Sequence, residues 1–390
     1  MPIEEVRTQR QARDFLRVPK ILYRNDTTWV CPLDREIEAV FDPEKNTFFR
    51  HGTATRFVTR NEKGNLTGRI AAFIDDKSAR THDQPTGGIG FFECINDQGA
   101  ANLLFDTAKE WLASRNMEAM DGPVNFGETD KYWGLLVEGF THPAYEIAYN
   151  SPYYQELFEN YGFRTYYNQE GFHLDITRPL PERFARIATW LMNKEEYSFE
   201  HFSWKEIHRY VNDFAEVYNQ AWASFKKNFE PMQPEYIIHT LKKARMIIEE
   251  EFIWIAYKQG KPIAIYLMYP DLNQILRHLD GRMHPWNMLK FLYLKHTKTM
   301  TRARGVLMGV IPEFQGRGIE AAIIMKLQEM FRRKSHFTEI EFSWVGDFNP
   351  KMKNIFLSVG SIPAKKYKTY RYLFDREKPF KRYPLPESNN

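Results

Sequence analysis

Runs of apolar residues along the first half of the chain predict a fixed order of strands and helices. Residues 56–60 and 68–74 have the composition of two strands and are joined by a polar turn, which favours a hairpin. A strand over 90–95 is followed by a helix over 100–114, whose apolar residues recur at helical spacing. A strand over 120–126 and a short helix over 153–161, closed by Gly162, complete the series.

The second half repeats this order, and two copies of one structural unit are therefore expected. The repeated elements are strands over 252–257, 262–268, 306–311 and 339–344, and helices over 319–333 and 350–358. Helices over 205–224 and 234–248 open this second unit. A proline-containing linker near 177–181 separates the copies, which predicts domains at 1–178 and 182–376 and a mobile tail at 377–390.

The fold class follows from how these elements must connect. A strand, helix and strand in succession require a parallel pair with a right-handed crossover, as expected at 90–126 and 306–344. The hairpins before them are antiparallel. The sequence therefore predicts an α/β protein of two units, each with a mixed central sheet flanked by helices.

The loop between the strand at 306–311 and the helix at 319–333 carries the clearest chemical signal. Pro312 ends the strand because it lacks a backbone donor. Gly316 and Gly318 then allow a sharp turn directly before the helix. The free N–H groups and the dipole of a helix N-terminus favour an anion, such as a phosphate.

This loop resembles the acetyl-CoA-binding motif of the GNAT N-acyltransferase superfamily, which reads Gln/Arg-x-x-Gly-x-Gly/Ala. The matching segment is Gln315-Gly316-Arg317-Gly318-Ile319-Glu320, preceded by Val310-Ile311-Pro312-Glu313-Phe314. The resemblance implies a tandem GNAT fold with acetyl-CoA or another acyl-CoA bound as a substrate. It also implies an acyl-CoA wedge between the strands at 306–311 and 339–344, with a backbone N–H near Val310 or Ile311 on the thioester carbonyl. The first half matches by order only, since 96–100 carries one glycine and an extra acid, and we expect it to be degenerate for CoA.

Glu320 departs from the motif, because the family has Gly or Ala at this position. A carboxylate in the first helical turn repels the ligand's pyrophosphate if it points inward, or stabilises the helix dipole from outside. The backbone donors survive in both cases, so binding is expected to be retained.

Candidate catalytic residues lie on the last strands. Alternation places Glu341 on one face of the strand at 339–344 with Glu339 and Ser343, so Glu341 is the candidate base, with a solvated strand face as the alternative. Many family members protonate the leaving thiolate with a tyrosine, but the matching residue here is Phe356, and Phe158 in the first half. Tyr367 is the candidate acid, with the nearby Tyr370 and Tyr372 as alternatives. Asn349 matches a family position near the ligand and also fits a helix N-cap.

We expect no metal. His278 and His284 flank Asp280, but a spacing of six residues matches no helical ligand pair, and that stretch reads as a loop. The two cysteines, Cys31 and Cys94, form neither a zinc site nor a disulfide framework on their own and fit a reducing compartment. Motifs of P-loop ATPases, α/β-hydrolases and zincins are absent from the sequence.

Length, charge and apolar content limit the kinds of partner that the protein is expected to bind. A length of 390 residues suits two domains, and the net charge of +4 argues against a dedicated nucleic-acid binder. No apolar run of 18 residues occurs, so we expect a cytoplasmic protein without a membrane partner; the oligomeric state is left open.

The sequence thus predicts an N-acyltransferase that transfers an acyl group, with acetyl as the default, to a small-molecule or peptide amine by direct attack. A non-catalytic CoA-binding or scaffold protein is the alternative that Glu320 and Phe356 favour. An aminoacyl transferase that uses charged tRNA has little support without a basic excess. Loops and helices around 225–234 and 270–300 are expected to select the acceptor.

Overall fold

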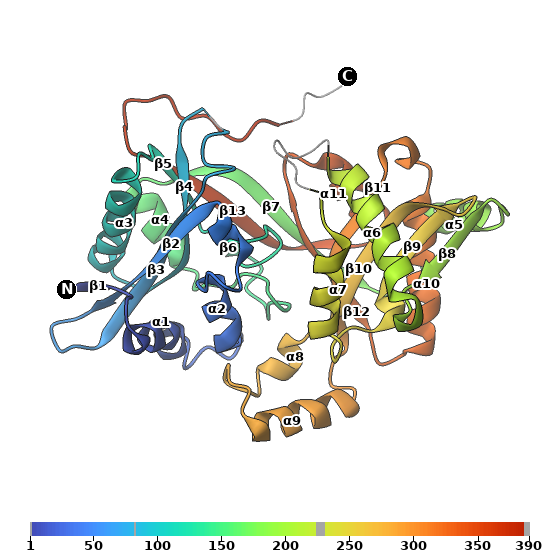
Figure 1. Cartoon of the computed structure of the whole chain (residues 1–390), viewed down its shortest axis with the longest axis horizontal. Helices are drawn as coiled ribbons and strands as arrows, with labels where there is room; N and C mark the ends of the chain where they lie inside the picture. Colours follow the sequence, from blue (N-terminus) through green and yellow to red (C-terminus); the bar gives the residue numbers. More distant parts are fainter. Residues whose placement is uncertain (1, 82, 224–230, 386–390) are drawn as a thin grey trace.

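The computed structural model describes residues 2–81, 83–223 and 231–385 (Figure 1). A mixed sheet of 13 strands runs through both halves of the chain, in the order β1-β2-β3-β4-β5-β13-β7-β12-β11-β10-β9-β8, with β6 paired to β13. The strands are β1 (Ile3–Glu5), β2 (Gly52–Arg60), β3 (Leu66–Asp75), β4 (Thr86–Cys94), β5 (Ala119–Gly122), β6 (Leu135–Glu138), β7 (Arg164–Asp175), β8 (Tyr197–His201), β9 (Ile253–Lys258), β10 (Lys261–Pro270), β11 (Arg302–Val310), β12 (Glu339–Gly346) and β13 (Ile362–Leu373).

Helices flank both halves of this sheet (Figure 1). They are α1 (Gln9–Leu22), α2 (Asp34–Val40), α3 (Gln98–Ala113), α4 (Tyr154–Tyr161), α5 (Glu182–Met192), α6 (Ile207–Trp222), α7 (Pro234–Lys243), α8 (Asn273–Leu276), α9 (Pro285–His296), α10 (Ile319–Arg333) and α11 (Pro350–Ser358). Short 3-10 turns lie at Thr47–Arg50, Trp204–Glu206, Glu250–Phe252 and Pro312–Phe314.

The repeated order of elements is confirmed. β2–β3 and β9–β10 are antiparallel hairpins, whereas β4–β5 and β11–β12 are parallel pairs connected through α3 and α10. β4 and β11 begin earlier than predicted, at Thr86 and Arg302, because small and charged residues at their starts hide the strand pattern. β5 ends earlier, at Gly122, where Pro123 follows and cannot donate to the ladder.

The last strand of each half pairs with the other half, which the sequence pattern did not indicate. β7 lies between β12 and β13, and β13 pairs with β5 of the first half. The two expected sheets are therefore one continuous sheet. Pairing between strands so far apart in the sequence depends on non-local contacts, which hydrophobic periodicity does not encode. The domain boundaries at 178 and 182 stay a prediction.

Two segments with predicted roles lie partly outside the described residues. The predicted helix over 205–224 is observed as α6 up to Trp222, and residues 224–230, with most of the predicted acceptor loop, lie outside the described part. The tail is described to residue 385. There the N–H of Tyr383 donates to the carbonyl of Tyr166 at 3.0 Å, and Arg382 pairs with Asp347 at 2.8 Å.

Candidate functional site

The N-terminus of α10 is open, as the motif requires. Gly316 and Gly318 have φ angles of 72° and 86°, which side-chain-bearing residues rarely adopt. Gly318 is the N-cap, and it has no side chain that could cap the helix. A Cβ on Gly318 would lie 2.4 Å from Cγ2 of Ile187 in α5, whereas a Cβ on Gly316 would meet nothing within 4 Å. The loop thus has backbone donors beside open space at Gly316.

The equivalent helix in the first half is closed. Asp97 is the N-cap of α3, and its Oδ1 accepts a hydrogen bond from the N–H of Ala100 at 2.7 Å. A carboxylate therefore occupies the place that an anionic ligand would take. That only the second unit binds CoA stays a prediction.

The predicted cofactor-binding residues surround the open loop. Gln315 donates from Nε2 to the carbonyl of Val310 at 3.1 Å and so braces the end of β11. The N–H of Ile311 donates to the carbonyl of Ile263 at 3.0 Å, which leaves Val310 as the candidate contact for the thioester. The exposed Arg317 guanidinium lies 5.3 Å from the centre of the Phe314 ring.

Ile319 and Asn349 have structural roles in the observed arrangement. Ile319 is fully buried in the core. Asn349 caps α11, because its Oδ1 accepts from the N–H of Met352 at 3.2 Å. A role of Asn349 toward the ligand stays a prediction.

Glu320, the residue that departs from the motif, is buried with 8% of its surface exposed. Burial raises the pKa of its carboxyl, and a hydrogen bond from its own backbone N–H partly offsets this. The protonated form of Glu320 carries no charge that would repel a pyrophosphate.

β11 and β12 separate where the acyl-CoA wedge is expected. Their parallel ladder ends at the pair Gly305 and Phe342, although β11 continues to Val310 and β12 to Gly346. Beyond that point β11 pairs only with β10, and β12 pairs with β7. Both outer ladders contain a register shift at this level, which bends the strands away from each other.

Gly305 marks the closed end of this wedge. A Cβ there would lie 2.9 Å from the Phe342 ring and 2.9 Å from the hydroxyl of Tyr266. The buried hydroxyl of Tyr266 has no hydrogen-bond partner in the described structure. An unpaired buried polar group of this kind commonly marks a ligand site or an ordered water.

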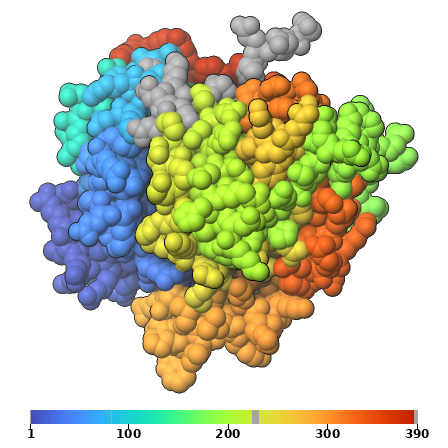
Figure 2. Space-filling model, turned by 45° about the vertical axis from the view of Figure 1, so that its right-hand side comes forward, coloured from blue at the N-terminus to red at the C-terminus, as the bar shows by residue number. Residues whose placement is uncertain are grey.

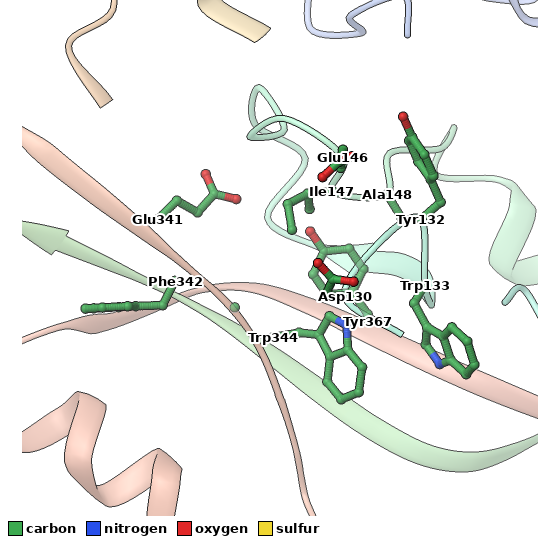
Figure 3. Close-up of a pocket in the computed structure, with 11 residues that line it drawn as sticks. Asp130, Tyr132, Trp133, Glu146, Ile147, Ala148, Glu341, Phe342, Trp344 and Tyr367 are labelled. Atoms are coloured by element: carbon green, nitrogen blue, oxygen red, sulfur yellow. The ribbon is translucent and has the colours of Figure 1, made fainter. Parts of the chain in front are cut away.

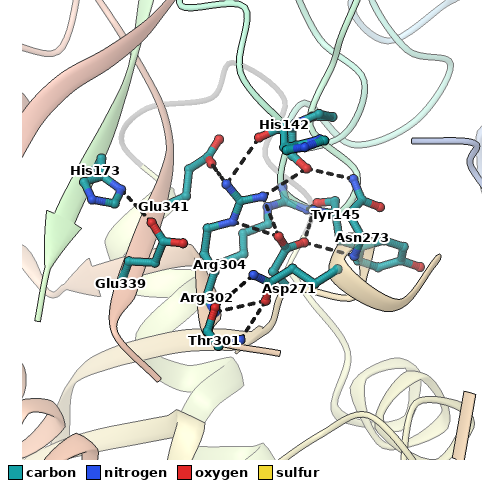
Figure 4. Close-up of polar contacts among 12 residues, drawn as sticks. His142, Tyr145, His173, Asp271, Asn273, Thr301, Arg302, Arg304, Glu339 and Glu341 are labelled. Atoms are coloured by element: carbon teal, nitrogen blue, oxygen red, sulfur yellow. Dashed lines mark hydrogen bonds and ion pairs between the residues drawn. The ribbon is translucent and has the colours of Figure 1, made fainter. Parts of the chain in front are cut away.

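Glu341 belongs to a buried network of charges (Figure 4). Its Oε1 accepts from Nζ of Lys365 at 2.6 Å, and its Oε2 accepts from Nη1 of Arg302 at 3.0 Å. Arg302 also pairs with the fully buried Asp271 at 2.6 Å. Glu341 is only 5% exposed, so the alternative interpretation, that it lies on a solvated strand face, is wrong. Its charge compensates two cations, and protonation would leave them short of one negative charge.

A second network joins the halves around Arg304, which is completely buried. Its Nη1 donates to the carbonyl of Tyr145 at 2.6 Å and to Oε2 of Glu146 at 3.1 Å. Glu146 also accepts from Lys131 at 2.7 Å and from Tyr269 at 2.8 Å. The neighbouring Lys131 and Arg304 lower the pKa of the Glu146 carboxyl despite its burial.

Tyr367 faces a small cavity beside Glu341, which we call the wedge cavity (Figure 3). The hydroxyl of Tyr367 is buried and has no hydrogen-bond partner in the described structure. Burial and the Glu341 carboxylate raise the pKa of Tyr367 well above its ordinary value. The other residues that line the wedge cavity are Asp130, Tyr132, Trp133, Glu146, Ile147, Ala148, Gly171, Phe342 and Trp344.

A larger cavity of about 100 Å³ lies mainly in the first half, and we call it the N-terminal cavity. Its walls are mainly aromatic and aliphatic, and they include Trp29, Phe91 and Tyr149. It shares four lining residues with the wedge cavity, namely Tyr132, Glu146, Ile147 and Ala148. The two cavities are therefore neighbours, with Tyr132 and residues 146–148 between them.

Glu36 of α2 contacts this region through Tyr145, which lines the N-terminal cavity. The hydroxyl of Tyr145 donates to Oε1 of Glu36 at 2.5 Å, while the buried Oε2 has no partner in the described structure. Burial, with a contribution from Glu146, raises the pKa of Glu36 to about 7. Sequence reasoning missed Glu36, because an isolated acid in a segment without a predicted element carries no pattern.

The remaining candidates have structural roles. Phe356 stacks on Phe342 with ring centres 4.3 Å apart, and Phe158 is fully buried in the core of the first half. His284 caps α9 by accepting from the N–H of Asn287 at 3.3 Å. Across residues 2–81, 83–223 and 231–385, His, Cys, Asp and Glu side chains form no group of three or more suited to a metal ion. The helices of the same ranges include none with the length and apolar character needed to cross a membrane.

The solved structures that resemble this chain have the GNAT fold. A tandem GNAT protein from the clavulanic acid biosynthesis pathway matches 97% of this chain and 100% of its own, with a TM-score of 0.58 and 11% identity. A GCN5-related N-acetyltransferase from Sphaerobacter thermophilus matches 98% of both chains, with a TM-score of 0.53 and 12% identity. A fungal multi-domain GH3 β-N-acetylglucosaminidase with a GCN5-related glucosamine N-acetyltransferase region matches at a TM-score of 0.57 and 14% identity. The alignment covers 95% of this chain and 38% of the fungal one. The chain therefore has the tandem GNAT fold that its motif implied.

Two relatives match over nearly the full length in sequence. A bacterial ceramide synthase of Caulobacter vibrioides is 27% identical over 374 residues, which cover 94% of this chain and 95% of the relative. Protein YghO of Escherichia coli K12 is 25% identical over 370 residues, or 91% of each chain. No protein-family model matches the chain.

Proposed function

We propose that the protein is an acyl-CoA-dependent N-acyltransferase whose donor site lies in the second unit. The pantetheine arm would enter between β11 and β12, and the pyrophosphate would lie at the N-terminus of α10. The observation that carries this proposal is the contrast between the two units: Asp97 caps α3, whereas Gly318 leaves α10 uncapped beside open space. The GNAT fold supports an acyltransferase of this type.

The proposed reaction is direct attack of an amine nitrogen on the thioester carbonyl. A C–N bond forms, the C–S bond breaks, one proton leaves the amine, and the thiolate of CoA takes up a proton. An N–H at the end of β11, near Val310, would stabilise the oxyanion of the tetrahedral intermediate.

Tyr367 is the proposed acid. Its raised pKa keeps the hydroxyl protonated at neutral pH, and this hydroxyl has no competing partner in the described structure. It lines the wedge cavity together with Phe342 and Trp344 of β12, and the proposal requires the leaving sulfur to reach this cavity. Tyr367→Phe is expected to lower kcat while acyl-CoA binding remains.

Two carboxyls are candidates for the base. Glu341 lines the wedge cavity, but both of its oxygens bind cations. Glu36 has a free oxygen and a pKa of about 7, which suits a base at neutral pH, and it reaches the cavity wall through Tyr145.

The pH dependence of kcat distinguishes these candidates. If Glu36 is the base, Glu36→Gln removes the rise in kcat near pH 7, and the folded Glu341→Gln variant keeps it. If Glu341 is the base, Glu341→Gln abolishes turnover in a protein that still binds acyl-CoA, and Glu36→Gln retains the wild-type profile.

We propose an amine with a long hydrocarbon chain as the acceptor. The aromatic and aliphatic lining of the N-terminal cavity fits such a chain, and its contact with the wedge cavity would bring the amine to the thioester. The similarity to a protein named bacterial ceramide synthase supports an amino alcohol of this class.

Release of free thiol from acetyl-CoA and palmitoyl-CoA tests the proposal across three acceptors: a long-chain amino alcohol, a short amino alcohol and a peptide amine. We expect turnover with the long-chain amino alcohol and far less with the short one. Equal rates with the short and long amino alcohols would contradict the chain site. Acyl-CoA binding without thiol release from any amine would favour the non-catalytic binding protein.

A further inference from the structure

Helix α9 exposes large apolar side chains to solvent along one face. Trp286, Leu289, Leu292 and Tyr293 are 77%, 58%, 44% and 66% exposed. Their spacing of three and four residues places them on adjoining turns of one side of the helix. The opposite side of α9 packs against the rest of the protein, because Phe291 is buried. Figure 2 shows this part of the chain protruding from the lower edge of the molecule.

The segment that contains α9 is rich in basic residues. Between residues 277 and 298 the sequence has five Lys or Arg residues and one acid, Asp280, so 5 − 1 gives an excess of +4. In the described structure none of the five forms an ion pair with Asp or Glu. They are Arg277, Arg282, Lys290, Lys295 and Lys298. Lys290 and Lys295 donate instead to the carbonyls of His278 and Met246.

We propose that α9 docks the protein on an anionic lipid surface. Exposed Trp, Leu and Tyr insert into the interface between headgroups and acyl chains, while Lys and Arg contact the anionic headgroups. Surface docking requires no membrane-spanning helix. The expectation that the protein has no membrane partner was based on the absence of an 18-residue apolar run, and that absence does not argue against docking through α9. A second copy of the chain fits less well, because a symmetric contact would bring both sets of uncompensated cations together.

The position of α9 connects this surface with the N-terminal cavity. Asn273, the first residue of α8, lines that cavity and donates to the carbonyl of Pro143 at 3.0 Å. The loop before α9 packs against the cavity wall: the carbonyl of Gly281 accepts from the N–H of Asp34 at 2.9 Å, and a Cβ on Gly281 would lie 2.7 Å from the carbonyl oxygen of Pro32. A lipid acceptor could thus pass from the membrane surface into the cavity, a step that rests on the proposed function.

Co-sedimentation with vesicles tests the docking separately from catalysis. Vesicles of phosphatidylcholine with 30% phosphatidylglycerol should bind the full chain, and vesicles of phosphatidylcholine alone should bind it at least about tenfold more weakly. Trp286→Ala with Leu289→Ala should lower binding to the anionic vesicles at least about tenfold. Trp190→Ala, at a residue of α5 that is 59% exposed, is the matched control and should leave binding unchanged.

Circular dichroism and calorimetry with acyl-CoA establish that the double variant folds and keeps its donor site. Equal vesicle binding by wild type and double variant would overturn the proposal, as would failure of the wild type to bind anionic vesicles. Light scattering that shows a wild-type dimer and a monomeric double variant would assign the apolar face to a second copy instead and would also overturn it. If the wild type binds anionic vesicles but releases no thiol with any acceptor, the result counts against the proposed function and leaves the docking proposal intact.

Discussion

Glu341 and Lys365 form an ion pair of 2.6 Å across β7, the strand that lies between their own two strands, and both side chains are almost fully buried. Lys365 belongs to β13 and Glu341 to β12, so the pair lies where the exchanged strands meet. Its position ties the candidate site to the element that makes the two halves one sheet.

We predict that Glu341→Gln lowers the free energy of unfolding by about 3 kcal/mol, because it leaves two buried cations without their shared counter-charge. Lys365→Met added to Glu341→Gln should recover part of this loss. Urea denaturation of the two single variants and the double variant measures the coupling. Additive effects of the two substitutions would show that the pair contributes nothing to stability.

Glu36 predicts a pH dependence of stability. Burial raises its pKa to about 7, above the ordinary 4.5 of a glutamate, so its protonated form favours the folded state. The stabilisation is fully present below about pH 4.5 and is lost as pH rises through about 7. Relative to Glu36→Gln, the wild type should lose up to about 3 kcal/mol of unfolding free energy between pH 4.5 and pH 8.

Urea denaturation of both proteins across this pH range checks the Glu36 prediction. The comparison uses the change in their difference with pH, because the amide itself alters stability by a constant amount. A difference that stays constant with pH would contradict the raised pKa.

Glu320 predicts a pH dependence of acyl-CoA binding. As pH rises through its raised pKa, a carboxylate forms in the first turn of α10 and opposes the pyrophosphate. Wild-type affinity for CoA should therefore fall as pH rises, and Glu320→Gln should bind more tightly at high pH. Calorimetry at several pH values measures both, and identical profiles would place the Glu320 charge away from the ligand.

The order of the repeated strands and helices could be predicted from the sequence because each of these elements has its own periodicity, and the glycine loop could be predicted because positive φ angles select glycine. The exchange of β7 and β13 could not be predicted, since either strand satisfies the same alternation in either half. The position of Arg302 and Arg304 on one face of β11 could be predicted from their spacing of two residues. In the structure they lie opposite Glu339 and Glu341 of the parallel neighbour β12. The register of β11 against β12, and the contacts of Arg304 with Glu146, follow from the strand pairing and could not be predicted without it.

The donor site at the N-terminus of α10 is the central claim, and calorimetric binding of acetyl-CoA to two glycine variants tests it most directly. Gly316→Trp fills the proposed pyrophosphate site and forces a side chain onto a φ of 72°. Gly260→Trp, in the hairpin between β9 and β10, is a matched control, because its φ is 76° and a Cβ there also meets nothing within 4 Å.

Both variants therefore carry similar backbone strain, on the order of 1–2 kcal/mol. We predict micromolar binding for the wild type and for Gly260→Trp, and at least about a hundredfold weaker binding for Gly316→Trp. Equal affinity of the two variants, or no heat from the wild type at millimolar acetyl-CoA, would contradict the account.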